Sequence, residues 1–117
     1  MNAVLVPAEE WRASLLAGRR ALREAYQRNP SPVQLLRAHA RLIDRILRGL
    51  WQDLQPASHA ALVATGGYGR AELFPSSDID ILVLLAREPT APERERLERL
   101  IGMFWDIGLE IAHSVRT

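Results

Sequence analysis

The stretch LVATGGYGRAELFPSSDIDILVLL, residues 62–85, decides the fold of this 117-residue chain. It opens inside an apolar run over residues 60–65 and closes with a second apolar run, rich in branched side chains, over residues 79–85. Short apolar runs bounded by turn-forming residues are typical of buried strands. The loop between them, residues 66–77, contains three glycines, two serines and one proline, all residues that favour turns. The sequence therefore predicts two strands joined by a loop of about a dozen residues.

A glycine pair, Gly66 and Gly67, opens this loop directly after the first predicted strand. Glycine lets a ligand approach the backbone closely, and it adopts the left-handed angles that turn successive N–H groups toward one point. Such a concave group of donors binds anions, and phosphate above all. A plain turn after a strand also uses glycine, so the pair alone does not separate the two interpretations.

An acidic pair, Asp78 and Asp80, stands at the start of the second predicted strand. Residues two apart on a strand point to the same face, about 7 Å apart along it. Two carboxylates placed in this way repel each other unless a cation lies between them. Magnesium suits such ligands because it prefers hard oxygen atoms and takes its remaining ligands from water and substrate phosphates. A solvated strand end after a Ser-Ser turn is the alternative interpretation.

The spacing between the two motifs is more informative than either motif alone. Ten residues separate Gly67 from Asp78, and a loop of this length can bring the glycine turn to the carboxylates. The turn would then hold a triphosphate while cations on the carboxylates contact its oxygens. Arg70 adds a cation that can contact phosphate at two places. Ser76 and Ser77 add hydroxyl or N–H groups that can contact the same oxygens.

The residues before this stretch predict a helical hairpin. Apolar residues recur at helical spacing over residues 7–28, and again over residues 31–54. Ser31 is a good N-cap for the second helix, and Pro56 closes it. This half of the chain contains no pattern of catalytic residues.

The residues after the stretch predict one more helix and one more strand. Thr90 and Glu93 have the spacing of a capping box, and the helix that they open reaches about Trp105. Residues 108–115 then predict a third strand. Together these features predict an α+β fold, a small mixed β-sheet with packed helices.

We expect two parts, a helical hairpin over residues 1–56 and a partial catalytic core over residues 57–117. The chain is expected to be truncated at its C-terminus, because three strands are near the minimum for an independent sheet.

Composition favours a soluble cytoplasmic protein. The formal net charge is +1, from 15 basic and 14 acidic residues, which gives no general argument for nucleic acid or a membrane as a partner. The chain has no cysteine, and this fits a reducing compartment. No segment is long and apolar enough to span a bilayer, and residues 1–11 do not have the pattern of a secretion signal.

The glycine pair, the ten-residue spacing and the Asp-hydrophobic-Asp strand resemble the nucleotidyltransferase superfamily typified by DNA polymerase beta. More narrowly, residues 66–85, 104–110 and 113–117 resemble the bifunctional PII uridylyltransferase/uridylyl-removing enzymes. One departure is Ala71, where that family usually has a further glycine. Alanine there would stiffen the loop and leave the proposed ligands intact.

The resemblance implies a reaction and a set of ligands. UTP would bind with Mg²⁺ or Mn²⁺ at Asp78 and Asp80, while Gly66, Gly67 and Arg70 hold its β- and γ-phosphates. A tyrosine of the nitrogen-regulatory PII signal protein would attack the α-phosphate and release pyrophosphate. Family members also contain a hydrolase domain that removes the uridylyl group and domains that sense glutamine, both outside these residues.

The resemblance also implies a third carboxylate on a neighbouring strand. Asp106 and Glu110 are the candidates, because residues four apart in a strand share one face. If Asp106 ends the preceding helix, Glu110 is better placed. A surface charge or a structural ion pair is the alternative for each.

Three other functions fit the same residues. The chain could belong to another transferase of the superfamily, such as the adenylyltransferase of glutamine synthetase or a small antitoxin-like enzyme. It could be a nucleotide-sensing module without turnover. It could also be an inactive fragment with an incomplete site.

Overall fold

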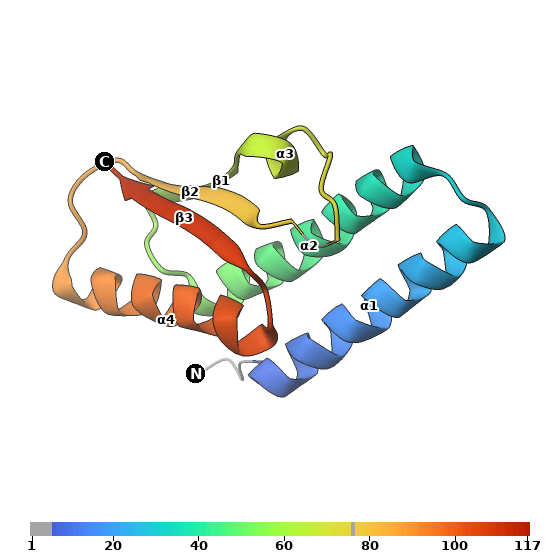
Figure 1. Cartoon of the computed structure of the whole chain (residues 1–117). Helices are drawn as coiled ribbons and strands as arrows, with labels where there is room; N and C mark the ends of the chain where they lie inside the picture. The colour runs from blue at the N-terminus through green and yellow to red at the C-terminus, as the bar shows by residue number, and fades with distance from the viewer. Residues whose placement is uncertain (1–5, 76) are drawn as a thin grey trace.

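The structure is a computed structural model that describes residues 6–75 and 77–117. Along this part of the chain the elements are α1 (Ala8–Arg28), α2 (Pro32–Leu54), β1 (Ala60–Ala64), α3 (Gly66–Gly69), β2 (Ile79–Leu85), α4 (Ala91–Ile107) and β3 (Ile111–Arg116) (Figure 1). The predicted α+β class, a small mixed sheet with packed helices, is confirmed.

Helices α1 and α2 form the predicted hairpin and run side by side (Figure 1). The Ser31 hydroxyl accepts a hydrogen bond from the Gln34 N–H at 3.4 Å and so caps the first turn of α2. Gly18 of α1 leaves space for the opposite helix, because a Cβ atom there would lie 2.5 Å from Leu42 Cδ1. The helices therefore pack closely, and Leu15 between them is almost fully buried.

The strands form one sheet in the order β1-β2-β3, in which β1 is antiparallel and β3 is parallel to β2. The register places Ala64 opposite Ile81, and Ile79 opposite Ile111. Side chains alternate between the faces of a strand. Ile79 and Ile81 are buried on one face of β2, whereas Asp80 lies on the other face and is partly exposed. One face of the sheet is thus packed, and the other carries the acidic residue.

Helix α4 begins with the predicted capping box. The Thr90 hydroxyl accepts from the Glu93 N–H, and the Glu93 carboxylate accepts from the Thr90 N–H at 2.8 Å. The helix continues to Ile107, beyond its predicted end. Gly108 ends it with a φ of 99°, in the left-handed region that glycine adopts without steric penalty. The third strand consequently begins at Ile111, and not at Gly108 as predicted.

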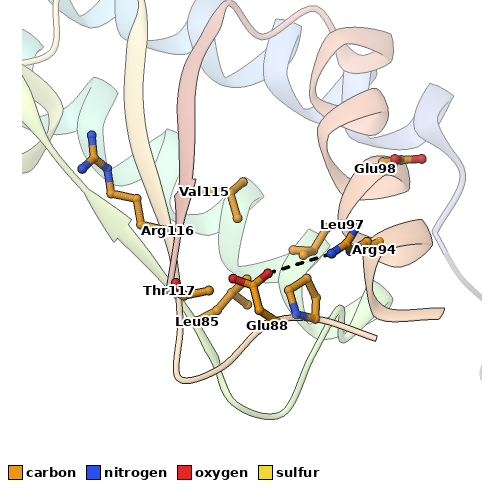
Figure 2. A pocket seen from close by; sticks show the side chains of 9 residues that line it. Leu85, Glu88, Arg94, Leu97, Glu98, Val115, Arg116 and Thr117 are labelled. Atoms are coloured by element: carbon orange, nitrogen blue, oxygen red, sulfur yellow. Dashed lines mark ion pairs between the residues drawn. The ribbon is translucent and has the colours of Figure 1, made fainter. Parts of the chain in front are cut away.

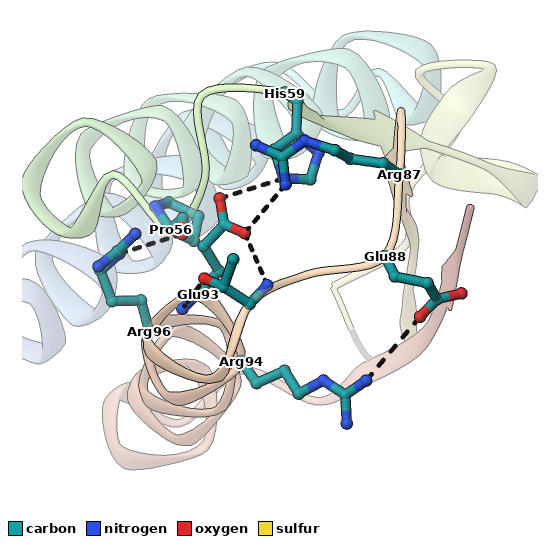
Figure 3. Close-up of polar contacts among 8 residues, drawn as sticks. Pro56, His59, Arg87, Glu88, Glu93, Arg94 and Arg96 are labelled. Atoms are coloured by element: carbon teal, nitrogen blue, oxygen red, sulfur yellow. Dashed lines mark hydrogen bonds and ion pairs between the residues drawn. The ribbon is translucent and has the colours of Figure 1, made fainter.

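A polar network joins the first turn of α4 to the residue just before β1 (Figure 3). The Glu93 carboxylate lies 3.1 Å from His59 Nε2 and 3.5 Å from Arg87 Nη1. Backbone hydrogen bonding from Thr90 is the main reason why the pKa of Glu93 falls to about 2. This network fixes the end of the sheet where β1 begins and β2 finishes.

The larger apolar cluster connects the hairpin with the sheet and with α4. Its buried members come from α1, α2, α4, β2 and β3, and include Leu15, Ile43, Leu50, Phe104, Ile79 and Ile111. The hairpin therefore supports the sheet directly. The division of the chain near residue 56 stays a prediction. In the described part of the chain, no helix combines the length and the apolar character needed to cross a membrane.

Candidate active site

The glycine-rich segment begins as a short helical turn, α3, where the sequence predicted a loop. Gly66 has a φ of +56°, a left-handed angle that residues with a side chain rarely adopt. The Gly69 N–H donates to the Thr65 carbonyl at 2.8 Å, and the Glu72 N–H donates to the Gly67 carbonyl at 2.8 Å. Within residues 6–75 and 77–117, no acceptor meets the N–H groups of Gly66 and Gly67. Successive free donors in a turn of this kind form an anion-binding concavity.

The glycine turn and the acidic pair meet at Gly66 and Asp80. A Cβ atom on Gly66 would lie 2.6 Å from Asp80 Oδ2, so the carboxylate occupies the space that a side chain would need. The Thr65 N–H donates to the Asp80 carbonyl at 3.0 Å and holds the two segments together. Position 66 therefore requires glycine for two reasons: the backbone angle is left-handed, and the carboxylate leaves no space for a side chain.

Asp78 and Asp80 lie two residues apart where β2 begins, so their side chains leave the same face of the strand. Ile79 is opposite Ile111 in the parallel pairing with β3, and its N–H donates to the Glu110 carbonyl at 2.8 Å. Asp78 and Glu110 directly precede these two paired residues, just before the strands begin, so the register makes them lateral neighbours. The structure thus brings both predicted aspartates and one of the two further candidates to the same end of the sheet.

The donor set fits a hard cation that the protein encloses only in part. Among the described residues, neither Asp78 nor Asp80 forms an ion pair with a basic side chain. In the same part of the chain, no three histidine or carboxylate side chains are gathered closely enough to hold a metal ion. Magnesium commonly uses one or two carboxylates and completes its shell with water and substrate phosphates. The two aspartates suit that mode of binding, and they do not suit an enclosed structural site.

The two candidates for a third carboxylate occupy different elements. Asp106 lies in the last turn of α4, where its carbonyl accepts a hydrogen bond from Arg12 Nε at 3.1 Å. Of the two placements that the sequence left open for Asp106, the structure shows the helix end, and not a strand shared with Glu110. The physical reason is that α4 continues until Gly108 ends it. Glu110, directly before β3, is the candidate that lies beside the aspartate pair.

The predicted phosphate ligands beyond the glycines lie on the surface of the same loop. The Arg70 side chain is 67% exposed and pairs with Glu72 at 3.6 Å, an exposed contact of the kind that is held weakly. A Cβ atom on Gly67 would lie 4.0 Å from Arg70 Nη2, so the guanidinium group is near the glycine pair. Ser77 is exposed directly before Asp78. Ser76 lies outside the described residues.

The sequence did not reveal that Tyr68 joins this loop to α2. Tyr68 follows the glycine pair and is buried, and its hydroxyl donates a hydrogen bond to Asp44 Oδ1. Burial, followed by the bond to Asp44, raises the pKa of Tyr68 well above its usual value. The two residues are 24 positions apart, so no local pattern connects them.

His39 of α2 is fully buried and holds a later part of the loop. Its Nδ1 donates to the Leu73 carbonyl at 3.2 Å, and its Nε2 accepts from Arg19 Nε at 3.4 Å. These contacts assign the proton to Nδ1 and keep the ring neutral. Burial is the main cause of the lowered pKa of His39, and the bond to Leu73 partly opposes it. Burial also lowers the pKa of Arg19, and the negative charge of nearby Glu110 partly offsets this decrease.

A pocket of about 580 Å³ lies at the other end of the sheet, among Leu85, Leu97 and Val115 (Figure 2). An exposed ion pair of 3.9 Å between Glu88 and Arg94 lies among its lining residues. Leu85 is five residues beyond Asp80 along β2, a distance of about 17 Å in a strand. The candidate active site is therefore defined by the contact of the glycine turn with the acidic pair, and not by this pocket.

Sequence comparison finds many similar proteins. The bifunctional uridylyltransferase/uridylyl-removing enzyme of Nitrosospira multiformis is 46% identical over 123 residues, which cover 100% of this chain and 14% of that enzyme. Enzymes of the same name from Chromobacterium violaceum and Thiobacillus denitrificans are 42% and 47% identical, over 100% and 95% of this chain and 14% and 13% of their own lengths. The chain thus spans only a small part of these relatives. No solved structure matches the chain.

The family comparison covers most of the residues described above. Residues 43–111 match the family model for a nucleotidyltransferase domain. This range includes the glycine turn, both aspartates and Glu110, and it takes in more than half of the chain. By this match, the chain belongs to the nucleotidyltransferase domain family.

Proposed function

We propose that this chain carries the nucleotide-binding core of a cytoplasmic enzyme that transfers a uridylyl group from UTP to a tyrosine of a PII protein. The tyrosine oxygen forms a bond to the α-phosphorus, the bond from that phosphorus to the β-phosphate oxygen breaks, and the hydroxyl proton is released with pyrophosphate. The family supports nucleotidyl transfer as the reaction class. The names of the relatives support the uridylyl group, and the resemblance of residues 66–85 supports the PII acceptor.

The observation that carries the proposal is the contact between Gly66 and Asp80. With Asp80 Oδ2 only 2.6 Å from where a Gly66 Cβ would be, a polyphosphate bound to the turn lies directly beside the carboxylate. Nucleotidyl transfer depends mainly on positioning the phosphates and neutralising their charge. A group of free N–H donors next to a pair of carboxylates that can hold a cation provides both.

Each residue of the site has a proposed role. Asp78 and Asp80 would hold Mg²⁺ or Mn²⁺, and the bound cation would offset the charge of the phosphates and of the leaving pyrophosphate. The N–H groups of Gly66 and Gly67 would orient the β- and γ-phosphates. Arg70 would exchange its weak pairing with Glu72 for a phosphate oxygen. Ser76 and Ser77 would donate to the same phosphates.

Glu110 is our proposed third carboxylate. It is the lateral neighbour of Asp78, because Ile79 and Ile111 pair in the adjacent register position. Asp106 is the alternative, although its backbone serves the end of α4. Responses to glutamine are proposed to arise outside these residues.

The experiment that tests this function is a transfer assay. The chain is incubated with a PII protein, UTP labelled at the α-phosphate and MgCl₂ or MnCl₂. We expect label on PII that disappears with a chelator and with a PII variant in which the acceptor tyrosine is replaced by phenylalanine. Labelled ATP in place of UTP serves as the matched control for the base.

The other functions give different results. Transfer from ATP and not from UTP would show a different nucleotidyltransferase. Metal-dependent binding of UTP without transfer would indicate a nucleotide-binding module. A chain that binds no UTP at any metal concentration would refute the proposal.

A further inference from the structure

Helix α2 holds the glycine loop through a buried side-chain contact. Tyr68 is only 6% exposed, and its hydroxyl donates to Asp44 Oδ1 in the middle of α2. Arg48, one helical turn further along, acts on the same phenol through its charge. Tyr68 directly follows Gly67, so this contact fixes the backbone immediately next to the proposed phosphate donors.

A second contact from the same helix holds the loop further along. His39 is fully buried and its Nδ1 donates to the Leu73 carbonyl at 3.2 Å, with Arg19 Nε behind it at 3.4 Å. The loop segment from residue 68 to residue 73 therefore lies between two attachment points on α2. We call the two contacts, Asp44–Tyr68 and His39–Leu73, the α2 clamp.

The α2 clamp is needed for a physical reason. Three of the four residues of α3 are glycine, and glycine loses more conformational freedom on ordering than any other residue. If the site is already ordered before the ligand binds, the entropy cost of ordering it does not reduce the binding affinity. Because α2 is packed into the larger apolar cluster, it is a rigid reference for the turn.

We propose that Asp44 and Tyr68 are positioning residues, which place the Gly66 and Gly67 N–H groups against the Asp80 carboxylate for the triphosphate of the nucleotide. This inference rests on the proposed function. The two residues do not touch the nucleotide, and they act through the glycine turn. A purely structural role for the pair would affect stability alone.

The variants Tyr68→Phe, Asp44→Ala and Asp44→Asn test the inference. Phenylalanine keeps the buried ring and removes only the donor, whereas asparagine keeps an acceptor for the tyrosine hydroxyl. Thr90→Ala is the matched control, because it removes a helix cap at the far end of the sheet and lowers stability without touching the loop.

Two measurements are made on the full chain. Amide hydrogen exchange at Gly69 and Glu72 reports the order of the turn without any nucleotide, and calorimetry with Mn²⁺ and UTP reports affinity. We expect Tyr68→Phe and Asp44→Ala to speed exchange at both amides and to weaken UTP binding about tenfold, the effect of losing one hydrogen bond to a charged group. The double variant should be no weaker than either single variant, and Asp44→Asn should stay close to the parent.

The outcomes separate this inference from the function on which it rests. Unchanged exchange in Tyr68→Phe overturns the clamp, and so does faster exchange with unchanged affinity. Equal loss of affinity in Thr90→Ala shows that affinity follows stability, which also overturns it. If exchange rises as expected and the parent chain binds no UTP, the clamp stands and the proposed function fails.

Discussion

The two ends of the sheet differ in whether the carboxylate found there has partners within the protein. At the end where α4 begins, the Glu93 carboxylate accepts a hydrogen bond from the Thr90 N–H at 2.8 Å. It also lies within 3.5 Å of His59 Nε2 and Arg87 Nη1. At the other end, Asp80 lies against Gly66 and, among the described residues, pairs with no basic group. A carboxylate with its partners in place stabilises the fold, whereas one without them is available to a ligand. This difference, more than the presence of acidic residues, distinguishes the proposed site.

The largest expected effect comes from replacing the Asp80 carboxylate with an amide. Asp80→Asn should lower transfer about 100-fold or more, as removal of an electrostatic stabiliser commonly does. Because the Asp80 side chain forms no ion pair among the described residues, the free energy of unfolding should change by no more than about 0.5 kcal/mol. Transfer rates and urea unfolding curves check both expectations.

Glu93→Gln is the matched control at the other end, and it should lose stability while its transfer rate per folded molecule stays near the parent value. If Asp80→Asn transfers at the parent rate, the metal role of Asp80 is excluded.

A second change tests the room beside Asp80. Gly66→Ala forces a Cβ atom to within 2.6 Å of Asp80 Oδ2 and gives alanine a φ of +56°. We expect more than about tenfold weaker binding of UTP and a loss of about 1–2 kcal/mol from the left-handed angle. Calorimetry and thermal unfolding measure the two effects.

Gly102→Ala is the matched substitution, because the residue is inside α4 and, apart from that helix's own backbone and the adjacent residues, the described part of the chain has no atom within 4 Å of the added Cβ. It should stabilise the chain by up to about 1 kcal/mol and leave UTP binding unchanged. Equal affinities in the two alanine variants would show that the glycine turn does not meet the triphosphate.

A third pair of variants separates the remaining carboxylates. Glu110→Gln should lower metal-dependent transfer about tenfold, because a carboxylate that supports the direct metal ligands contributes less to activity than the aspartate pair itself. Asp106→Asn should have little effect, since Arg12 contacts its backbone carbonyl. Transfer assays over a range of Mn²⁺ concentrations give the measurement, and the reverse ranking of the two variants would assign the role to Asp106.

The smallest expected effect is a dependence of stability on pH. The folded-state pKa of Glu93 is about 2, which lies below the ordinary value of 4.5. The stability that the ionised carboxylate adds is therefore fully present above pH 4.5 and is lost as the pH falls toward 2. Urea unfolding of the parent and of Glu93→Gln between pH 5 and pH 2 should show a smaller decline in the variant. Parallel curves would contradict this role for Glu93.

Local signals in the sequence predicted most of the fold. The run of branched residues over 79–85 predicted β2, and the spacing of Thr90 and Glu93 predicted the capping box. Both predictions were confirmed because each feature depends on residues that are close together in the sequence. The end of α4 was misjudged because the helix continues as far as its left-handed cap at Gly108, which leaves only Glu110 at the start of a strand.

The contacts that order the loop could not be predicted in this way. Tyr68 and Asp44 are 24 positions apart, and His39 and Leu73 are 34 positions apart. Each pair depends on how α2 packs beneath the loop, and no spacing rule connects such residues. The motif predicts which residues would contact the phosphates, whereas tertiary packing determines what supports those residues.

The contact between Arg12 and the carbonyl of Asp106 links residues 94 positions apart. It has a consequence for the order in which the chain acquires its structure during synthesis. Helix α1 leaves the ribosome well before the end of α4, which is one of its neighbours in the structure. Leu15 is the buried residue of α1, and until then α1 packs against α2 alone. Helix α1 is therefore expected to become fully ordered only once α4 is complete, and a nascent chain stalled before residue 106 should expose α1 to proteases.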